Sequence, residues 1–176
     1  AFSNCTLLKS VVIPDGVEYI GANAFNNCNQ LKSVYIGDGV KSIEGGAFIW
    51  CGSLTDLRLG KNVQAIGYEA FCGCGSLRNI EFGNQLQYIS DRSFAGCGSL
   101  TDLVLPPNLI EISYYAFEGC GNLKELKIPS SVKYIRDGAF TGCPFEKVYT
   151  YTIEPTNINQ NTFSAYKTAK LYVPAT

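Results

Sequence analysis

Apolar residues recur along this chain of 176 residues at a constant interval of about 23 residues. Ile recurs seven times in one register, from Ile20 to Ile158, and Leu six times, from Leu8 to Leu123. Cys follows three residues after each of the first seven Phe of the series. Since four residue types share one register, the pattern indicates an internal repeat. The Phe series consists of Phe2, Phe25, Phe48, Phe71, Phe94, Phe117, Phe140 and Phe163.

Each repeat has the pattern of three short segments, shown here by the unit at residues 8–28. Residues 8–13 end in the alternating pattern that is typical of a half-buried strand. A Pro or Gly at the next position ends this strand. Residues 17–20 point Val and Ile inward and are a candidate for a second short strand. Residues 24–28 carry Ala, Phe and Cys at the spacing of a single helical or 3₁₀ turn.

A unit as short as this repeat cannot bury its own apolar side, so the repeats are predicted to stack into one solenoid. We expect a single domain over residues 1–176 with about seven repeats. Short parallel strands, about 4.8 Å apart, would line a concave face, with the extended segments and turns on the convex side. In this arrangement the Phe side chains form a ladder along one wall, with Cys and Ile ladders beside it.

The repeat is irregular near the C-terminus, where residues 144–176 have the pattern of an atypical terminal repeat. One residue is missing after Cys143, so Phe145 takes the position of the repeated Leu. A polar run that includes Pro155 follows, and one extra residue before Ile158 restores the register. The N-terminus begins inside a repeat at Phe2, and the chain has no Met; we therefore expect an excised or processed piece with further repeats upstream or a frayed first repeat.

Composition narrows the possible functions. Hydrophobic residues make up 46% of the chain and charged residues 16%, which is enough apolar material for a core. The net charge of −1 gives no electrostatic footprint for nucleic acid, and no apolar run is long enough to cross a membrane. The absence of His excludes catalysis by His and metal binding by His. We expect neither a nucleic-acid partner nor membrane insertion in this segment.

The cysteines are predicted to be small buried apolar residues rather than disulfides or metal ligands. An odd ladder of parallel side chains is poorly placed for disulfides, and a spacing of one cysteine per repeat provides no zinc motif. Cys72 lies outside the ladder and is expected near the surface as a free thiol. No metal or cofactor is expected.

The repeated runs at residues 31–36, 40–43 and 47–51 resemble the BspA-like, or treponemal-type, leucine-rich repeat family. The resemblance covers essentially the whole chain. The chain differs from ordinary leucine-rich repeats in one respect, because it lacks the continuous ladder of Asn residues that their consensus requires. It implies a secreted or cell-surface bacterial protein that binds host, matrix or neighbouring-cell proteins. An extracellular or cell-surface location is therefore implied by the family and not by the cysteines.

Residues that alternate with the buried strand positions should face solvent on the concave side. They vary in type along the chain, and they include aromatic residues and Arg, the usual anchors of protein interfaces. Unconstrained drift of a surface without function explains the variation equally well. The candidate binding residues are Val12, Tyr35, Arg58, Glu81, Val104, Lys127, Tyr149 and Tyr172.

These features favour a protein-interaction module without catalytic activity, and the alternative is a rigid spacer that presents another domain. A carbohydrate-active enzyme is a remote third hypothesis that depends on paired carboxylates. Basic residues are interleaved with those carboxylates, however, which is typical of a solvated face of mixed charge. The carboxylates are Asp56, Glu81, Asp102 and Glu125, and the interleaved basic residues are Arg58, Arg78, Lys124 and Lys127.

Overall fold

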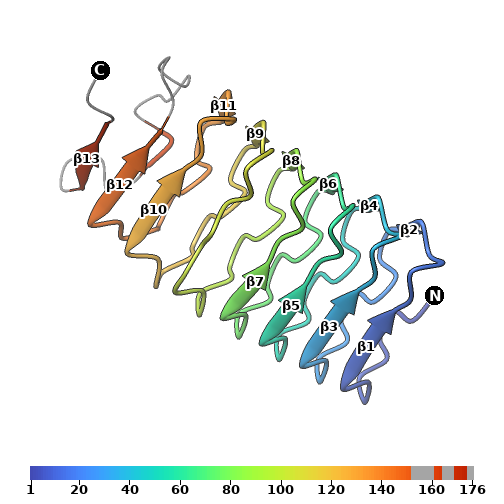
Figure 1. Cartoon of the computed structure of the whole chain (residues 1–176). Helices are drawn as coiled ribbons and strands as arrows, with labels where there is room; N and C mark the ends of the chain where they lie inside the picture. Colours follow the sequence, from blue (N-terminus) through green and yellow to red (C-terminus); the bar gives the residue numbers. More distant parts are fainter. Residues whose placement is uncertain (152–160, 164–168, 174–176) are drawn as a thin grey trace.

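The computed structural model describes residues 1–151, 161–163 and 169–173. Each repeat forms one coil, and the coils stack into an elongated solenoid with the N-terminus at one end and strand β13 (Lys170–Tyr172) at the other (Figure 1). All the named elements in the described residues are short strands, and each coil has three walls. The predicted parallel solenoid and its period are confirmed, since Val11 pairs with Val34 and Val34 pairs with Leu57.

The first wall carries the first strand of the coils. Strands β1, β3, β5 and β7 form a four-stranded parallel sheet on this wall, and β10, β12 and β13 form a three-stranded one. Most register partners occupy the same position of consecutive repeats. Glu125 pairs with Lys147, however, and this register shift by one position compensates for the residue missing after Cys143. The strands are β1 (Ser10–Ile13), β3 (Ser33–Ile36), β5 (Asp56–Arg58), β7 (Asn79–Glu81), β10 (Glu125–Ile128), β12 (Lys147–Thr150) and β13 (Lys170–Tyr172).

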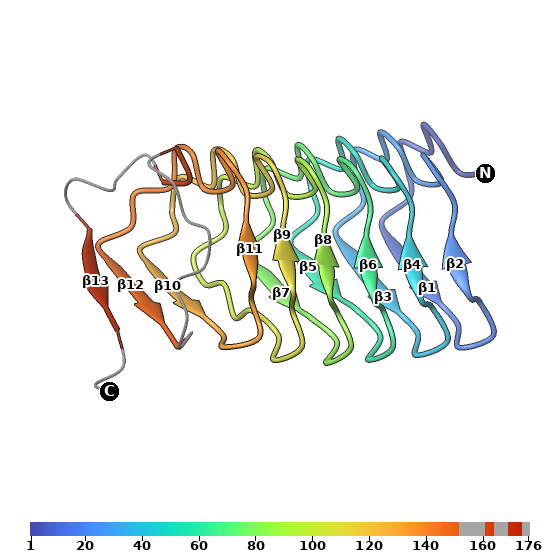
Figure 2. The same ribbon diagram turned by 90° about the horizontal axis from the view of Figure 1, so that it is seen from above.

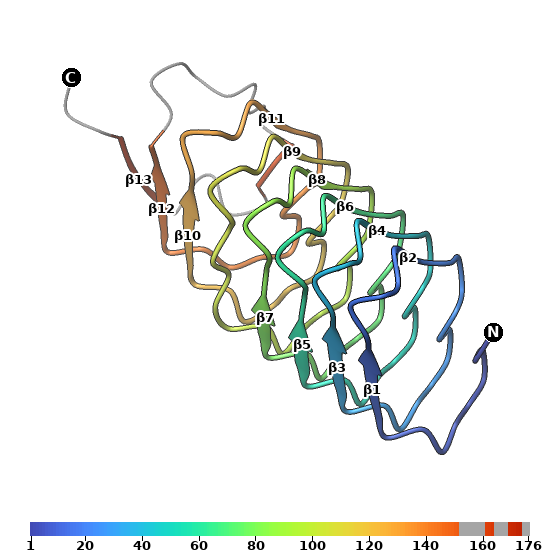
Figure 3. The ribbon, with the colours of Figure 1, turned by 45° about the vertical axis from the view of Figure 1, so that its right-hand side comes forward.

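The second wall confirms the candidate second strand of each repeat. Here an unbroken six-stranded parallel sheet runs along the stack (Figure 2). Figure 3 shows the two sets of strands on different walls of the coil. The strands are β2 (Tyr19–Ile20), β4 (Ser42–Ile43), β6 (Ala65–Ile66), β8 (Tyr88–Ile89), β9 (Glu111–Ile112) and β11 (Tyr134–Ile135).

The third wall holds the Phe residues, and here the prediction of a helical or 3₁₀ turn is wrong. The backbone N–H of Cys28 does donate to the carbonyl of Phe25 at 3.3 Å, as in a tight turn. The N–H of Phe25, however, donates to Ala47 of the next coil at 2.7 Å. Positive φ angles of 55° at Asn23 and 59° at Asn27 redirect the chain on both sides of Phe25. A helix would keep these N–H groups within one coil, whereas the turns bond coil to coil.

The Phe side chains form the predicted ladder. Consecutive ring centroids lie 5.0 to 5.4 Å apart, with interplanar angles of 2° to 8°. Five of the rings, from Phe48 to Phe140, are fully buried. Phe2 is 53% exposed because it stacks on one side only, at the N-terminal end.

The cysteine ladder is buried as predicted, and it also donates hydrogen bonds. Each thiol of the ladder from Cys28 to Cys143, which leaves out Cys72, donates to the carbonyl of a Phe in the preceding coil, at sulfur–oxygen distances of 3.1 to 3.5 Å. Burial raises the pKa of the Cys51 thiol to about 12. All eight thiols are free, and Cys72 is half-buried. The ladder therefore links the coils without covalent bonds.

The first wall departs from the prediction at residues 101–105, which form no strand. Val104 makes one isolated bridge to Lys127. Pro106 lacks the N–H that Gly37, at the same position of the repeat, donates to Ile13 at 2.8 Å. Phe82, which replaces a smaller Ile or Leu, is half-buried, and its ring meets Phe94 edge-on at 5.9 Å. At residues 101–105 the first wall is thus divided into two sheets.

The last coils are described only in part. Phe145 is buried at the Leu position, as predicted, and its ring centroid lies 5.5 Å from that of Phe140. Pro155 and Ile158, which were central to the expected terminal repeat, lie outside the described residues. A single domain over residues 1–176 with an irregular end stays a prediction.

We expect Phe71→Ala to lower the free energy of unfolding by about 3–5 kcal/mol, because it removes a buried ring that stacks on both sides. Phe2→Ala should cost much less, since Phe2 is half exposed and has one stacking partner. Urea unfolding of both variants measures the difference. Equal losses would contradict the stacked core.

Thiol accessibility gives a second prediction. A maleimide reagent should label Cys5 and Cys72 in the native protein and all eight thiols in denaturant. The buried thiols are shielded, and burial raises the pKa of Cys51 and Cys74, so little reactive thiolate forms. Mass spectrometry of the labelled peptides identifies the sites. Rapid native labelling of Cys74 would show that the ladder opens.

Candidate functional site

The outward side chains of the first wall form what we call the strand face. The eight predicted binding residues lie on it in two groups of four, separated by the break in the sheet after Glu81. Within each group, neighbours along the stack are register partners, so each group forms one column along the wall. The first group is Val12, Tyr35, Arg58 and Glu81, and the second is Val104, Lys127, Tyr149 and Tyr172.

The first group lines an open groove of about 750 Å³, together with the turns that follow the strands. Gly60 and Gly83 let these turns approach closely, because a Cβ on either would overlap the carbonyl of the glycine one coil earlier. Val12 is 72% and Tyr35 45% exposed, so apolar surface is available at the N-terminal end of the groove. The turn residues that line it are Pro14, Asp15, Gly37, Asp38, Gly60, Lys61, Gly83 and Asn84.

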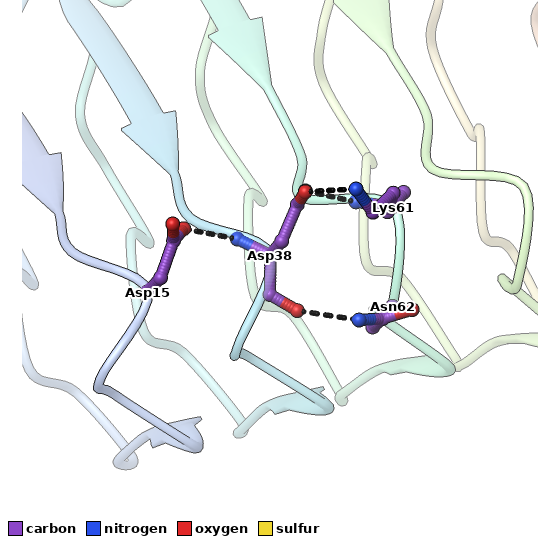
Figure 4. Close-up of polar contacts among 4 residues, drawn as sticks. All are labelled: Asp15, Asp38, Lys61 and Asn62. Atoms are coloured by element: carbon purple, nitrogen blue, oxygen red, sulfur yellow. Dashed lines mark hydrogen bonds and ion pairs between the residues drawn. The ribbon is translucent and has the colours of Figure 1, made fainter.

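A polar ladder joins three of these turns (Figure 4). Asp15 accepts the N–H of Asp38 at 2.8 Å, and Asp38 accepts the N–H of Lys61 at 3.0 Å. The Lys61 ammonium also lies 2.6 Å from the Asp38 carboxylate. Asn62 donates to the Asp38 carbonyl at 2.9 Å. These bonds fix one rim of the groove, and the hydrogen bond from Lys61 lowers the pKa of Asp38.

Two ion pairs join charged residues of the strand face. Arg58 lies 3.3 Å from Glu81, and Lys127 lies 3.2 Å from Glu125. Asp56 accepts a hydrogen bond from the Thr55 hydroxyl at 2.7 Å. Two of the four carboxylates considered for catalysis are thus in ion pairs, which agrees with a solvated face of mixed charge.

The second group brings aromatic and basic side chains together. The rings of Tyr149 and Tyr172 stack at 4.6 Å with an interplanar angle of 17°. The Lys127 ammonium lies 5.9 Å from the centroid of Tyr149, within the range of a cation–π contact. Val104 is 77% exposed beside them. This end of the strand face presents side chains that commonly anchor protein partners.

Sequence reasoning missed the turn residues at the rim of the groove. The sequence signal for these turns is the pair Asp-Gly, which follows the first strand of two consecutive coils, at Asp15 and at Asp38. Asp-Gly favours turns, and its recurrence at one position of the repeat places the two carboxylates in line. Only the stacking shows that each side chain bonds to the next coil.

Neither a metal site nor a membrane span is found within the part of the chain that the structure describes. No group of three His, Cys, Asp or Glu side chains there could hold a metal ion. No helix among those residues is long and apolar enough to cross a lipid bilayer.

These features define the chain as a parallel β-solenoid of the leucine-rich repeat type. A family model described as the BspA type leucine rich repeat region matches residues 1–120 and 89–176, in 6 copies. The chain therefore belongs to the BspA-type leucine-rich repeat family, as its sequence indicated. No curated protein matches it.

Solved bacterial structures share the fold. A leucine rich repeat protein of T. pallidum is 31% identical over 80% of this chain and 64% of its own, with a TM-score of 0.65. The pneumococcal vaccine antigen PcpA is 17% identical over 96% of this chain and 63% of its own, with a TM-score of 0.67. A leucine-rich repeat protein from Eubacterium ventriosum is 26% identical over 86% and 46%, with a TM-score of 0.58. This chain spans less than two thirds of each of these proteins.

The Asp38–Lys61 contact makes a prediction about pH. The pKa of Asp38 is lowered, so the contact should persist at neutral pH and be lost as the pH falls through that lowered pKa. Lys61→Ala should raise the pKa toward the usual value of about 3.9, although the backbone N–H still holds it down in part. NMR titration of the carboxyl carbon measures this, with Lys41→Ala as the control. An unchanged midpoint in Lys61→Ala would contradict the contact.

Proposed function

We propose that this chain is a protein-interaction module of a secreted or cell-surface bacterial protein, and that it binds its partner through the strand face. The observation that carries the proposal is the groove beside the first group of residues. It combines exposed apolar surface at Val12 and Tyr35 with the ion pair of Arg58 and Glu81. Such a mixture of aromatic, apolar and Arg side chains is typical of protein interfaces.

The family and the solved structures support the bacterial setting of this proposal. The T. pallidum protein is described as a leucine rich repeat protein and PcpA as a vaccine antigen. For this chain, location and adhesion remain part of the proposal.

A rigid spacer is a second candidate, because the stack itself is favoured by specific contacts. The Phe ladder continues from Phe2 to Phe163, and the second wall is unbroken. A solenoid held in this way would keep its length and could hold another domain at a distance. The spacer needs no binding on the strand face, so binding measurements separate the two candidates.

Binding to a panel of purified cell-surface and extracellular-matrix proteins, measured by biolayer interferometry, tests the proposal. For any protein that binds, Tyr35→Ala should weaken affinity by about tenfold or more, as for an aromatic anchor. Arg58→Glu should also weaken it, because it breaks the ion pair with Glu81 and reverses a charge in the groove.

Tyr88→Ala is the matched control, since Tyr88 is 44% exposed on the second wall and Tyr35 is 45% exposed on the strand face. It should leave affinity unchanged within about twofold. If all three variants bind every partner as the unchanged protein does, the strand face is not the binding surface and the spacer is favoured.

A further inference from the structure

Trp50 is the only Trp of the chain, and it occupies an unfavourable position of the repeat. Its φ angle is 61°, in the left-handed region that bulky residues rarely adopt. The same position holds Asn27 in the preceding coil and Gly73 in the following one. The Trp50 side chain is 57% exposed, so it adds little to the core. The solenoid accepts Asn or Gly at this position, and folding does not explain the Trp.

The indole of Trp50 lies along the stack, over the backbone of Gly73. A Cβ on Gly73 would overlap Cε3 and Cζ3 of the indole, so the ring occupies the space of a side chain. At Gly96, one coil further, a Cβ would meet only backbone atoms, at an ordinary distance of 3.7 Å. The protein thus backs one side of the indole, and the exposed fraction shows that much of the ring remains open to solvent. We call this surface the Trp50 platform.

Tyr115 shows the same arrangement together with a partner for its ring. A Cβ on Gly138 would overlap Cδ1 and Cε1 of the tyrosine ring. The guanidinium of Arg92 lies 4.9 Å from the centroid of that ring, and Arg92 is also in an ion pair of 3.0 Å with Glu118. Within the described residues, no guanidinium or ammonium group lies over the Trp50 ring in this way. The platform is therefore available to a ligand.

The surface around the platform carries almost no charge. We call it the neutral corner, and it follows the Phe position in five consecutive coils. Glu118 is its only charged residue, and Glu118 is already paired with Arg92. A cationic ligand would find no unpaired carboxylate on this corner, and an anionic ligand would find no Lys or Arg. The neutral corner consists of residues 26–30, 49–53, 72–76, 95–99 and 118–122.

Uncharged hydrogen-bonding groups lie beside the platform. The backbone N–H of Asn27 donates to the carbonyl of Ile49, the residue before Trp50, at 2.8 Å. The Asn27 side chain is thus held in the adjacent coil, where its amide donates to Asn4 at 2.8 Å. That bond uses one of the two amide hydrogens, and the Oδ1 atom can accept a further bond. Donors and acceptors of this kind suit hydroxyl groups, which both donate and accept.

We propose that the Trp50 platform binds a neutral polysaccharide of β-linked pyranose units. One sugar ring lies on the indole, and its hydroxyls meet the amide groups of the neutral corner. A pyranose with equatorial hydroxyls presents C–H groups on both faces, and their partial positive charge is attracted to the negative face of an aromatic ring. This site lies on another wall from the strand face, so the proposal adds a second ligand class to the proposed function.

The same features disfavour the other common ligands of an exposed Trp. A Trp that anchors a protein partner is commonly packed in a pocket, whereas this indole lies on the backbone of its own chain. Single-stranded nucleic acids stack on aromatic rings as well, but they also need a positively charged groove. The neutral corner has no basic residue. A neutral sugar requires only the flat ring and the uncharged polar groups.

Isothermal titration calorimetry of the whole chain with cellohexaose tests the proposal. Trp50→Asn should weaken the affinity about tenfold or more, because it removes the platform. The fold should persist in this variant, since Asn27 already occupies the same position with a φ of 59°. In the unchanged protein the fluorescence of the single Trp should change as cellohexaose binds. Absence of binding, or equal affinity in Trp50→Asn, would overturn the proposal.

Two glycine variants test the placement of the ring. Gly73 and Gly96 both have a φ of 75°, so Ala strains the backbone equally at either position. Gly73→Ala displaces the indole and should weaken cellohexaose binding, whereas Gly96→Ala is the matched control and should not. Urea unfolding of both variants checks that they fold. If two folded variants bind cellohexaose equally well, the indole is not the platform.

Further ligands and variants separate the alternatives. Hexagalacturonate, which is anionic, should bind more weakly than cellohexaose, and the reverse order would contradict a neutral ligand. If cellohexaose does not bind and Trp50→Asn instead weakens a protein of the binding panel, Trp50 is a protein contact and the proposal is wrong. Tyr35→Ala should leave cellohexaose binding unchanged, because Tyr35 lies on the strand face. Sugar binding and partner binding therefore fail or succeed independently.

Discussion

Identical side chains at the same position of consecutive repeats stack on one another and hold each coil of this protein to the next. The Phe rings stack almost parallel at 5.0 to 5.4 Å, which is close to the spacing of strands in a sheet. The rings and the backbone ladders can therefore keep one repeat distance, and each constrains the other. The cysteine thiols add a hydrogen bond from each coil to a Phe carbonyl of the preceding one.

This constraint fixes the residue types at the buried positions of the solenoid and leaves those on its surface free to vary. The buried positions repeat the same residue types, while the strand face varies from Val12 to Tyr172. At residues 101–105, beside the larger inner residue Phe82, the first wall is broken, whereas the second wall remains continuous. The strand face thus has a groove at one end and a basic, aromatic edge at the other.

The turns at Phe show where the reasoning from sequence failed. Ala24, Phe25 and Cys28 have helical spacing, but spacing does not reveal which carbonyl each N–H will meet. In the solenoid a neighbouring coil offers the Ala47 carbonyl at 2.7 Å, and Asn23 and Asn27 adopt the left-handed conformation that makes this bond possible. For the same reason the rim contacts of Asp15 and Asp38 could not be read from the sequence, since their partners lie one full coil away.

The sequence by itself determined the solenoid, its repeat period, the Phe and Cys ladders and the order of the eight residues along the strand face, because each follows from a strict repeat of buried residue types. The tertiary structure decided the turn conformation, the groove beside Tyr35, the break after Glu81 and the stacking of Tyr149 on Tyr172. These features depend on contacts between coils, and a contact between coils exists only once the chain has stacked.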